Sequence, residues 1–422
     1  MFQPSKVRGV TKLVSKCVAS PQDGRMLSSL ALEKLKSDPE LTRKYLLGPG
    51  PTNMHPDVIK AMTWPNRGHM HPEFLDIMDD VRVGLRYLFD TDNALTLAVS
   101  GPGHSAMEAS LVNLIEPGDK AVILRNGFWS LRAAMTARNA GADVVEVHAP
   151  LGTTFSLEQI EQALTTHKPK VLFIVHGESS TGVVQCMDGM ADLCHAHNCL
   201  IIVDAVASIA GTPFHMDKWD IDCVYAGSQK AVGGPAGIAP ISFNDRAWHK
   251  IANRQSPFRS LMVDMTQLGT YWGCFAQPRQ YHHTAPIQLV YGLRQALSMI
   301  AREGLENVWH RHASNAQLFY DGLEKLGLKL FIPNKADRLA PITTISIPSG
   351  TDWQLLIADM WRFHGIEIWG GMGETAGKIW RVGIMGYNSR PEIVSMALAG
   401  LQDCLARQHE IGEQKMAAQR HG

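Results

Sequence analysis

The chain has no net charge and no long hydrophobic run. Its 40 lysines and arginines balance 40 aspartates and glutamates, so the formal net charge at pH 7 is zero. A neutral chain gives no electrostatic reason to expect binding to nucleic acid or to an anionic membrane. No apolar stretch approaches the length of a membrane-spanning helix. We therefore expect neither nucleic acid nor a membrane as a partner.

Cysteines are few and show no paired spacing. The sequence holds seven, an odd number without a C-x-x-C motif, which argues for reduced thiols inside a cell. His195 and His197 lie between Cys194 and Cys199, a grouping that resembles a metal site. The two histidines are not four residues apart, as a helical ligand pair would be, and we predict no metal.

Short apolar runs alternate with helical patterns from about residue 93 onward. The runs are Leu95–Val99, Lys120–Leu124, Asp143–Val147, Lys170–Val175 and Leu200–Val203. Helical stretches lie between these runs. One begins at Gly103, a second continues through Ala140, and two more cover Leu157–Leu164 and Met187–His197. This alternation predicts an α/β fold with a mostly parallel, open sheet and helices on both faces.

The pattern changes toward the C-terminus. A long helical segment is expected from Pro286 to Leu326, ended by Gly327, because glycine readily adopts the left-handed conformation that ends a helix. Beyond it we expect strands at Leu328–Ile332, Thr343–Ile347 and Lys378–Ile384, and helices at Trp353–Phe363 and Arg390–Arg407. This region predicts a smaller C-terminal α+β domain.

The N-terminal segment is basic. Its first 22 residues contain four lysines and arginines, no acid, and apolar residues that gather on one side of a helical wheel. That pattern predicts a mitochondrial transit peptide over residues 1–25 and delivery to the mitochondrial matrix, the alternative being a disordered basic tail. A start at Met26 would remove the segment and leave a cytosolic or peroxisomal protein, although the chain does not end in an S-K-L signal.

Lys230 and Asp204 each follow a predicted buried strand. Asp204 closes the run Leu200–Val203, and Lys230 follows Val224-Tyr225-Ala226 after a turn of small residues. Considered alone, Lys230 would be interpreted as a surface lysine and Asp204 as a helix N-cap. Together they suit pyridoxal phosphate (PLP), which needs a lysine for a Schiff base and a carboxylate to keep its ring nitrogen protonated. Because ligands bind at the carboxyl ends of parallel strands, we predict a PLP site there.

The segment Ser100–Ser105 is a glycine-containing turn between a strand and a helix. Its glycines let the backbone approach a phosphate, and the helix N-terminus offers free N–H groups and the positive end of a dipole. The turn lacks the lysine of a P-loop, and many such turns bind nothing.

Five longer motifs identify a family resemblance. They are Leu47-Gly48-Pro49-Gly50-Pro51, His176–Gly182 (HGESSTG), Tyr271-Trp272-Gly273-Cys274, Tyr281-His282-His283-Thr284 and Trp380-Arg381-Val382-Gly383. With Asp204–Ser208 and Gly227–Lys230, they resemble the class V aminotransferases of PLP fold type I. Within that family the chain is most similar to the animal alanine–glyoxylate (serine–pyruvate) aminotransferases and to the insect hydroxykynurenine transaminases. The resemblance extends from about Leu46 to about Leu405.

The resemblance implies roles for individual residues. Lys230 and Asp204 would be catalytic, and the cofactor would also contact Gly103, His104, Trp129, Ser179, Val206 and Gln229. The Trp129 indole would stack on the pyridine ring. Pro102 departs from the family, in which serine is usual at this position. Proline has neither a hydroxyl nor a backbone N–H to donate to the phosphate.

The resemblance also implies a shared site and a substrate anchor. Tyr281 and Thr284 would cross a homodimer interface to the neighbouring subunit's PLP phosphate, the alternative being a surface loop. Arg381 would bind the substrate carboxylate with its guanidinium fork, helped by Gly50 and Ser179. The expected domains are an N-terminal extension packing on the dimer over residues 26–65, a PLP-binding domain over 66–310, a small domain over 311–410 and a tail over 411–422.

The implied reaction is transamination of L-alanine or L-serine with glyoxylate. The products would be pyruvate or hydroxypyruvate and glycine, formed in two half reactions in which Lys230 moves the α-proton. The alternative within the family is a kynurenine or 3-hydroxykynurenine transaminase that uses glyoxylate or pyruvate as acceptor. Two other classes are alternatives. A cysteine desulfurase would need a nucleophilic cysteine on a mobile loop. A non-catalytic phosphate-binding protein would hold no cofactor bound to a lysine.

Overall fold

The computed structural model describes residues 32–258 and 260–420. Residues 32–43 belong to a short separate unit with one helical turn, and the main unit begins at Lys44. The predicted transit peptide of residues 1–25 lies outside the described residues, so that prediction stands untested. Within the described chain, no helix combines the length and apolarity required to span a membrane.

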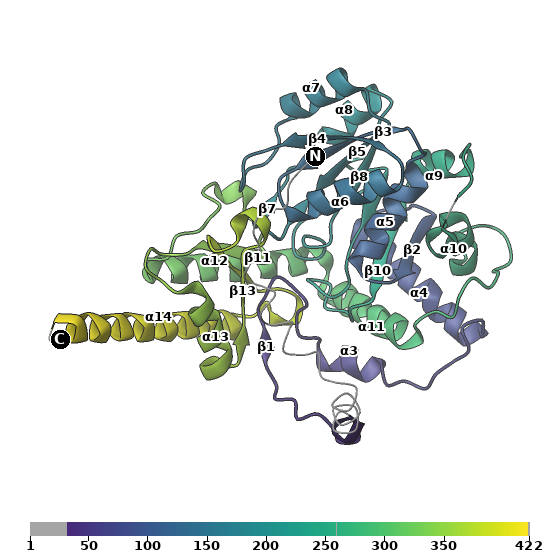
Figure 1. The fold of residues 1–422 in the computed structure, drawn as a ribbon. Helices are drawn as coiled ribbons and strands as arrows, with labels where there is room; N and C mark the ends of the chain where they lie inside the picture. The colour runs from purple at the N-terminus through teal and green to yellow at the C-terminus, as the bar shows by residue number, and fades with distance from the viewer. Residues whose placement is uncertain (1–31, 259, 421–422) are drawn as a thin grey trace, which may run out of the picture. The chain divides into compact units, whose positions relative to one another are not determined.

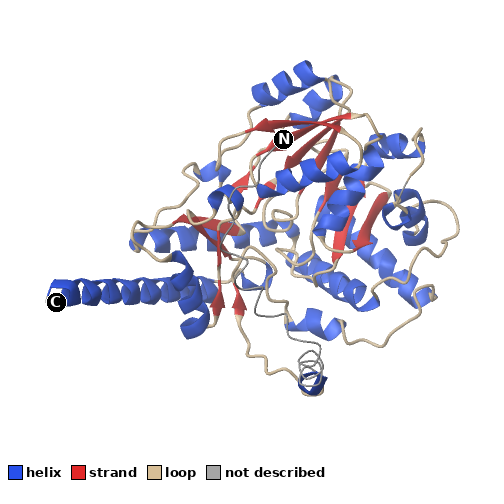
Figure 2. Cartoon of the chain, in the orientation of Figure 1, coloured by secondary structure: helices blue, strands red, loops and turns tan. Residues whose placement is uncertain are grey.

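A seven-stranded sheet forms the centre of the main unit (Figures 1 and 2). Its strands, in spatial order, are β2 (Leu95–Ser100), β10 (Ile238–Phe243), β9 (Cys223–Tyr225), β8 (Leu200–Asp204), β5 (Val171–Val175), β3 (Lys120–Arg125) and β4 (Asp143–His148). The pairs from β9 to β4 are all parallel, and β10 runs antiparallel to both of its neighbours. The mostly parallel sheet predicted from the apolar runs is therefore confirmed.

Helices cover both faces of this sheet, and α5 and α6 lie in front of the strands in Figure 1. The main-unit helices up to residue 272 are α3 (Pro56–Ala61), α4 (Pro72–Phe89), α5 (Gly103–Leu114), α6 (Phe128–Asn139), α7 (Leu157–His167), α8 (Met190–Ala196), α9 (Asp245–Ala252) and α10 (Met265–Trp272). Of these, α5 and α7 start at the predicted residues, Gly103 and Leu157. Helix α8 begins three residues later than expected, after Gly189 in a left-handed conformation.

The C-terminal part has its own small sheet and its own core. The sheet contains β11 (Ile342–Ser346), β14 (Ile379–Gly383) and β13 (Trp369–Gly370), all antiparallel, flanked by α13 (Trp353–His364) and α14 (Pro391–Arg420). A parallel pair joins β1 (Tyr45–Leu46) to β12 (Ile366–Glu367). The buried apolar side chains of this part form a second cluster, separate from the cluster around the large sheet. The predicted C-terminal α+β region is confirmed.

Two of the predicted elements are wrong. The long helix expected over residues 286–326 is two helices, α11 (Ile287–Glu303) and α12 (Leu305–Lys325), separated by Gly304 at φ +86°. A helix cannot continue through that conformation, and the apolar periodicity on both sides conceals the break. The strand expected at Leu328–Ile332 is a single bridge between Leu330 and Ile345. Gly327 does end α12, at φ +70°.

His312 links α12 to the turn before α14, and its protonation should weaken the fold. Its buried ring donates from Nδ1 to the Val308 carbonyl (2.8 Å) and accepts the Gly386 N–H at Nε2 (2.9 Å). Burial lowers its pKa from the ordinary 6.5 to about 3. The folded state therefore keeps His312 neutral, while the unfolded chain takes up a proton below about pH 6.5.

Stability should consequently fall as the pH drops from about 6.5 toward 3. This histidine alone should account for a loss on the order of 2 kcal/mol at pH 5. The measurement is urea unfolding at pH 7 and pH 5 for the wild type and His312→Gln, whose side chain does not titrate. Equal losses of stability in the two proteins would contradict the assignment.

Candidate active site

One pocket collects most of the residues predicted from the sequence. It lies at the carboxyl ends of β8 and β9 and encloses about 480 Å³, including open space at its mouth, a size usual for small-molecule sites. Its lining is Pro102, Gly103, His104, Met107, Trp129, Gly177, Ser179, Asp204, Val206, Ala207, Tyr225, Gln229 and Lys230. Eight predicted residues are thereby brought together: Gly103, His104, Trp129, Ser179, Asp204, Val206, Gln229 and Lys230.

Asp204 is the last residue of β8 and is held by two donors. One carboxylate oxygen accepts the backbone N–H of Val206 (2.9 Å), and the other accepts the hydroxyl of Tyr225 (2.7 Å) on the neighbouring strand. Burial raises the pKa of Asp204 to about 6, against the opposing effects of these hydrogen bonds and of the Lys230 charge. The carboxylate is thus fixed in direction and ready to share a proton with a basic nitrogen in the pocket.

Lys230 lies in the turn between β9 and β10, and its side chain is buried. Burial, with a smaller effect of the Arg381 charge, lowers its pKa from 10.5 to about 8, against the opposing charges of Asp204 and Glu178. An amine with this pKa has a much larger neutral fraction near neutral pH than an ordinary lysine, and its neutral form can act as a nucleophile or a base. Its Nζ lies 5.9 Å from the centre of the Trp129 ring.

The N-terminus of α5 borders the pocket and has free backbone donors. Pro102 is the N-cap residue and offers no side-chain cap; its carbonyl accepts the N–H of Ser105 (2.8 Å), but the N–H groups of Gly103 and His104 have no partner from it. Gln229 faces the same pocket, and its buried amide oxygen has no hydrogen bond. The first N–H groups and the positive helix end fit a phosphate group, to which Gln229 could donate only through its amide nitrogen.

The indole of Trp129 is fixed beside Ser179. Trp129 stands in the first turn of α6, and its Nε1 donates to the Ser179 hydroxyl (2.6 Å). Ser179 lies in the turn of the hairpin formed by β6 (Gly177–Glu178) and β7 (Val183–Val184). The indole therefore presents its face to the pocket as a flat wall for an aromatic ring.

Arg381 on β14 lies behind Ser179 and is not in the pocket's immediate lining. It is 2% exposed, and its guanidinium donates to the carbonyls of Gly370 (2.8 Å) and Ser179 (3.3 Å). Burial lowers its pKa to about 10, opposed by Glu178, so it keeps its charge at neutral pH. The remaining donors of its planar fork suit a carboxylate.

The structure does not bring Tyr281 and Thr284 into this pocket. Both are exposed, Tyr281 at 62%, and neither lines the site in the single chain. Tyr281 lies against the ring of His69, and the adjacent His283 hydrogen bonds to Ser100. His195 is also elsewhere, where it hydrogen bonds to the buried Asp222.

Sequence reasoning gave no role to two buried groups at the site. Tyr225 was treated as part of a strand, yet its hydroxyl binds Asp204. Glu178 stands in a quoted motif, yet only its neighbour Ser179 received a role. A carboxylate between a glycine and two serines in an otherwise apolar region is the signal that could have indicated a buried acid.

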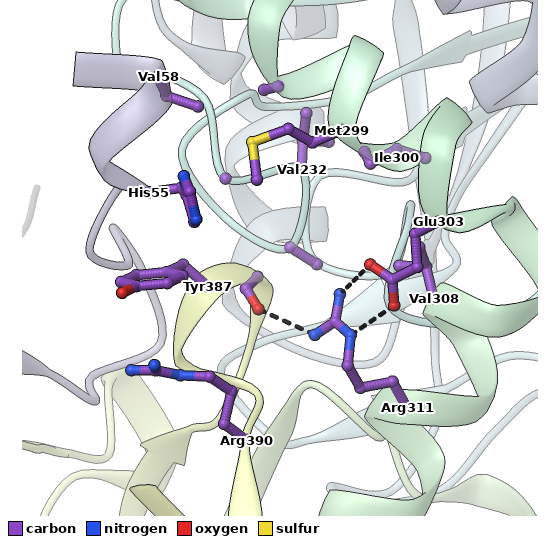
Figure 3. Close-up of a pocket in the computed structure, with 14 residues that line it drawn as sticks. His55, Val58, Val232, Met299, Ile300, Glu303, Val308, Arg311, Tyr387 and Arg390 are labelled. Atoms are coloured by element: carbon purple, nitrogen blue, oxygen red, sulfur yellow. Dashed lines mark hydrogen bonds and ion pairs between the residues drawn. The ribbon is translucent and has the colours of Figure 1, made fainter. Parts of the chain in front are cut away.

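A second pocket is lined by the residues that directly follow Lys230. It encloses about 720 Å³ and is bordered by α11, α12 and the turn before α14 (Figure 3). Figure 3 shows Arg311 paired with Glu303 at its edge, and most of the remaining wall is apolar. None of the residues predicted to bind a cofactor or substrate lines it, so this pocket is distinct from the site of Lys230 and Asp204.

The fold and the first pocket define a class of protein. A buried lysine of lowered pKa, a fixed aspartate, a tryptophan wall and a helix N-terminus at the carboxyl ends of a mostly parallel sheet fit PLP and its phosphate. The class V aminotransferase family model (Aminotransferase class-V) matches residues 44–395. The chain belongs to this family and is a PLP-dependent aminotransferase of fold type I.

Three relatives illustrate the similarity. The alanine–glyoxylate aminotransferase of Felis catus is 44% identical over 367 residues, which is 87% of this chain and 89% of the relative. A crystal structure of alanine–glyoxylate aminotransferase from Nostoc sp. has 43% identity and a TM-score of 0.86, covering 88% of this chain and 98% of that chain. The ureidoglycine–glyoxylate aminotransferase structure from Bacillus subtilis has 34% identity and a TM-score of 0.86, with 88% and 95% covered.

Gly50 lies against the stem of Lys230, and substituting it should disturb the lysine. A Cβ at this position would stand 2.8 Å from the Lys230 Cγ, and Gly50 has φ +107°. Gly50→Ala should cost about 1–2 kcal/mol in backbone strain and, by displacing the lysine, reduce kcat/KM about tenfold or more. Gly118→Ala is the matched control, because Gly118 has φ +90° with nothing within 4 Å. Equal activity of the two folded variants would contradict this.

Proposed function

We propose that this aminotransferase moves the amino group of L-alanine, or of L-serine, to glyoxylate. The observation that carries this proposal is the single buried arginine behind Ser179, with no arginine among the residues that line the described pocket. One guanidinium anchors one carboxylate, as a monocarboxylic donor and a small acceptor require. A dicarboxylate would call for a second cation. The names of the relatives, in which glyoxylate recurs, support the same acceptor.

The chain's own residues would perform the proton transfers. When bound, PLP supplies an aldehyde for the amino group and a ring that accepts electrons from the α-carbon. Lys230 Nζ, partly neutral because of its lowered pKa, removes the α-proton of the substrate and later acts as the acid. Asp204, oriented by Tyr225, would be the residue that keeps the ring nitrogen protonated. Arg381 would fix the substrate carboxylate, and the Trp129 indole would offer its flat face to the cofactor.

Acceptor kinetics test the proposal. With alanine as donor, kcat/KM should be at least tenfold higher for glyoxylate than for 2-oxoglutarate, because the second carboxylate has no arginine in the pocket to pair with. A preference for 2-oxoglutarate would reject the proposed acceptor while leaving the aminotransferase family unaffected.

We further propose a homodimer with shared sites, in which Tyr281 and Thr284 complete the site of the neighbouring subunit. Its support is their exposure and their distance from the chain's own pocket lining. Co-expression of Lys230→Ala with Tyr281→Phe/Thr284→Ala should restore activity, because each hybrid has one intact site. Random assortment should give about a quarter of wild-type specific activity. An active monomer in sedimentation, or no rescue, would contradict the shared site.

A further inference from the structure

Glu178 is a fully buried acid that none of the proton transfers above uses. It ends β6, has no exposed surface, and lies close enough to Lys230 and Arg381 for its charge to raise the pKa of each, while the charge of Asp204 in turn affects Glu178. Burial and the neighbouring Asp204 charge raise the pKa of Glu178, whereas the N–H groups of Ser180 and Trp129, which donate to its oxygens, favour its ionised form. The bonds that Glu178 makes should therefore show what its presence achieves.

Glu178 caps helix α6 from another part of the chain. Its Oε2 accepts the backbone N–H of Trp129 (3.1 Å), one of the N–H groups that the first turn of a helix leaves free. The helix's own N-cap residue, Gly127, supplies no side-chain bond. A Cβ at Gly127 would lie 2.3 Å from the Glu178 carboxylate carbon, so glycine is needed there for the approach. A carboxylate at this end also favours the helix dipole.

The same carboxylate fixes the hairpin turn that carries Ser179. Its Oε1 accepts the N–H of Ser180 (2.9 Å), and the Ser180 hydroxyl in turn accepts the N–H of Phe128 (2.9 Å). The next bonds outward are from the Trp129 indole to the Ser179 hydroxyl and from Arg381 to the Ser179 carbonyl. Glu178 thus bonds to both the first turn of α6, which carries the Trp129 indole, and the Ser179 turn in front of Arg381, and holds the two in one relative position.

We propose that ionised Glu178 is the positioning residue of this site: it holds the Trp129 indole and the Ser179 turn together and is the buried counter-charge of Arg381. This role rests on the aminotransferase chemistry proposed above but not on the identity of the amino donor. Glutamine has the same shape, but one of its two terminal atoms is an N–H donor that would face a backbone N–H. Glu178→Gln therefore removes the charge and one of the two bonds.

The test compares Glu178→Gln, Glu178→Asp and the wild type. In cofactor-free protein, the pH dependence of Lys230 acylation, quantified by mass spectrometry against exposed Lys60, reports the lysine's pKa without turnover. Glu178 holds that pKa up, so Glu178→Gln should shift the profile to lower pH. In holoenzyme, kcat/KM for the best donor should fall at least tenfold. Glu178→Asp keeps the charge but is one methylene shorter, so kcat/KM should fall without the shift.

Asp222→Asn is the matched control. Asp222 is equally buried and accepts a backbone N–H, from Ile201, but it lies at the other end of β8. This variant should be less stable, but the pH dependence of its Lys230 acylation and its kcat/KM per folded molecule should be unchanged. The proposal is overturned if Glu178→Gln behaves like this control. Should Glu178→Gln not fold, a normal kcat/KM in Glu178→Asp would overturn it instead. A wrong amino donor would leave the cofactor-free result unaffected.

Discussion

Lys230→Ala should abolish steady-state transamination while the protein stays folded. The lysine amine is the buried base beside the fixed Asp204, and the pocket lining contains no other lysine to replace it. Loss of a positioned general base and of the covalent attachment point should reduce kcat by at least about a thousandfold. The fold should persist, because removing a desolvated amine relieves a cost of burial.

The measurement is kcat with alanine and glyoxylate, accompanied by borohydride reduction and peptide mapping of the wild type. PLP should be trapped on Lys230, and Lys230→Ala should trap none. Lys250→Ala is the control, because Lys250 is a partly buried lysine engaged with Glu116 and Asp119 away from the site. A label on another lysine, or normal turnover by Lys230→Ala, would show that the assignment is wrong.

Arg381→Ala should lower kcat/KM for alanine by about 30- to 1,000-fold with PLP still bound. This corresponds to losing a bidentate, charge-assisted contact worth about 2–4 kcal/mol in the transition state. The cofactor should stay, because Lys230, the helix N-terminus and Trp129 hold it without Arg381.

Arg381→Lys is the informative control for this prediction. It retains a positive charge but not the planar fork, so its kcat/KM should lie between those of wild type and alanine variant. Steady-state kinetics and the cofactor content of each purified variant make the comparison. Loss of PLP together with activity, or equal kinetics in wild type and Arg381→Ala, would contradict a substrate-anchoring role.

The sequence predicted most strands of the large sheet, because most of them are buried on both faces; β10 was not predicted. Runs such as Leu172–Val175 and Ile201–Val203 are continuously apolar, and their carboxyl ends must share one edge of a parallel sheet. That geometry alone placed Lys230 beside Asp204. The position of the predicted phosphate site at the N-terminus of α5 followed from the same reasoning, because α5 starts directly after β2.

Other features could not be predicted because they depend on tertiary contacts. Gly304 breaks a helix whose apolar stripe continues on both sides, and only the φ of that residue shows it. The bond from Trp129 to Glu178 joins residues 49 positions apart, and the bond from Phe128 to Ser180 joins residues 52 apart, pairings that no local pattern records. Tyr281 and Thr284 were placed by resemblance, and a single chain leaves them exposed.

The most direct test of the account is the half reaction of the purified holoenzyme, followed by the absorbance of its bound cofactor, against a panel of amino acids. The account predicts that L-alanine, and L-serine to a similar degree, converts the cofactor rapidly, and that glyoxylate restores the starting spectrum far faster than 2-oxoglutarate does. Glutamate and aspartate should react far more slowly, because no arginine lines the described pocket to pair with their second carboxylate. Rapid conversion by 3-hydroxykynurenine or glutamate with a slow response to alanine would contradict the proposed reaction.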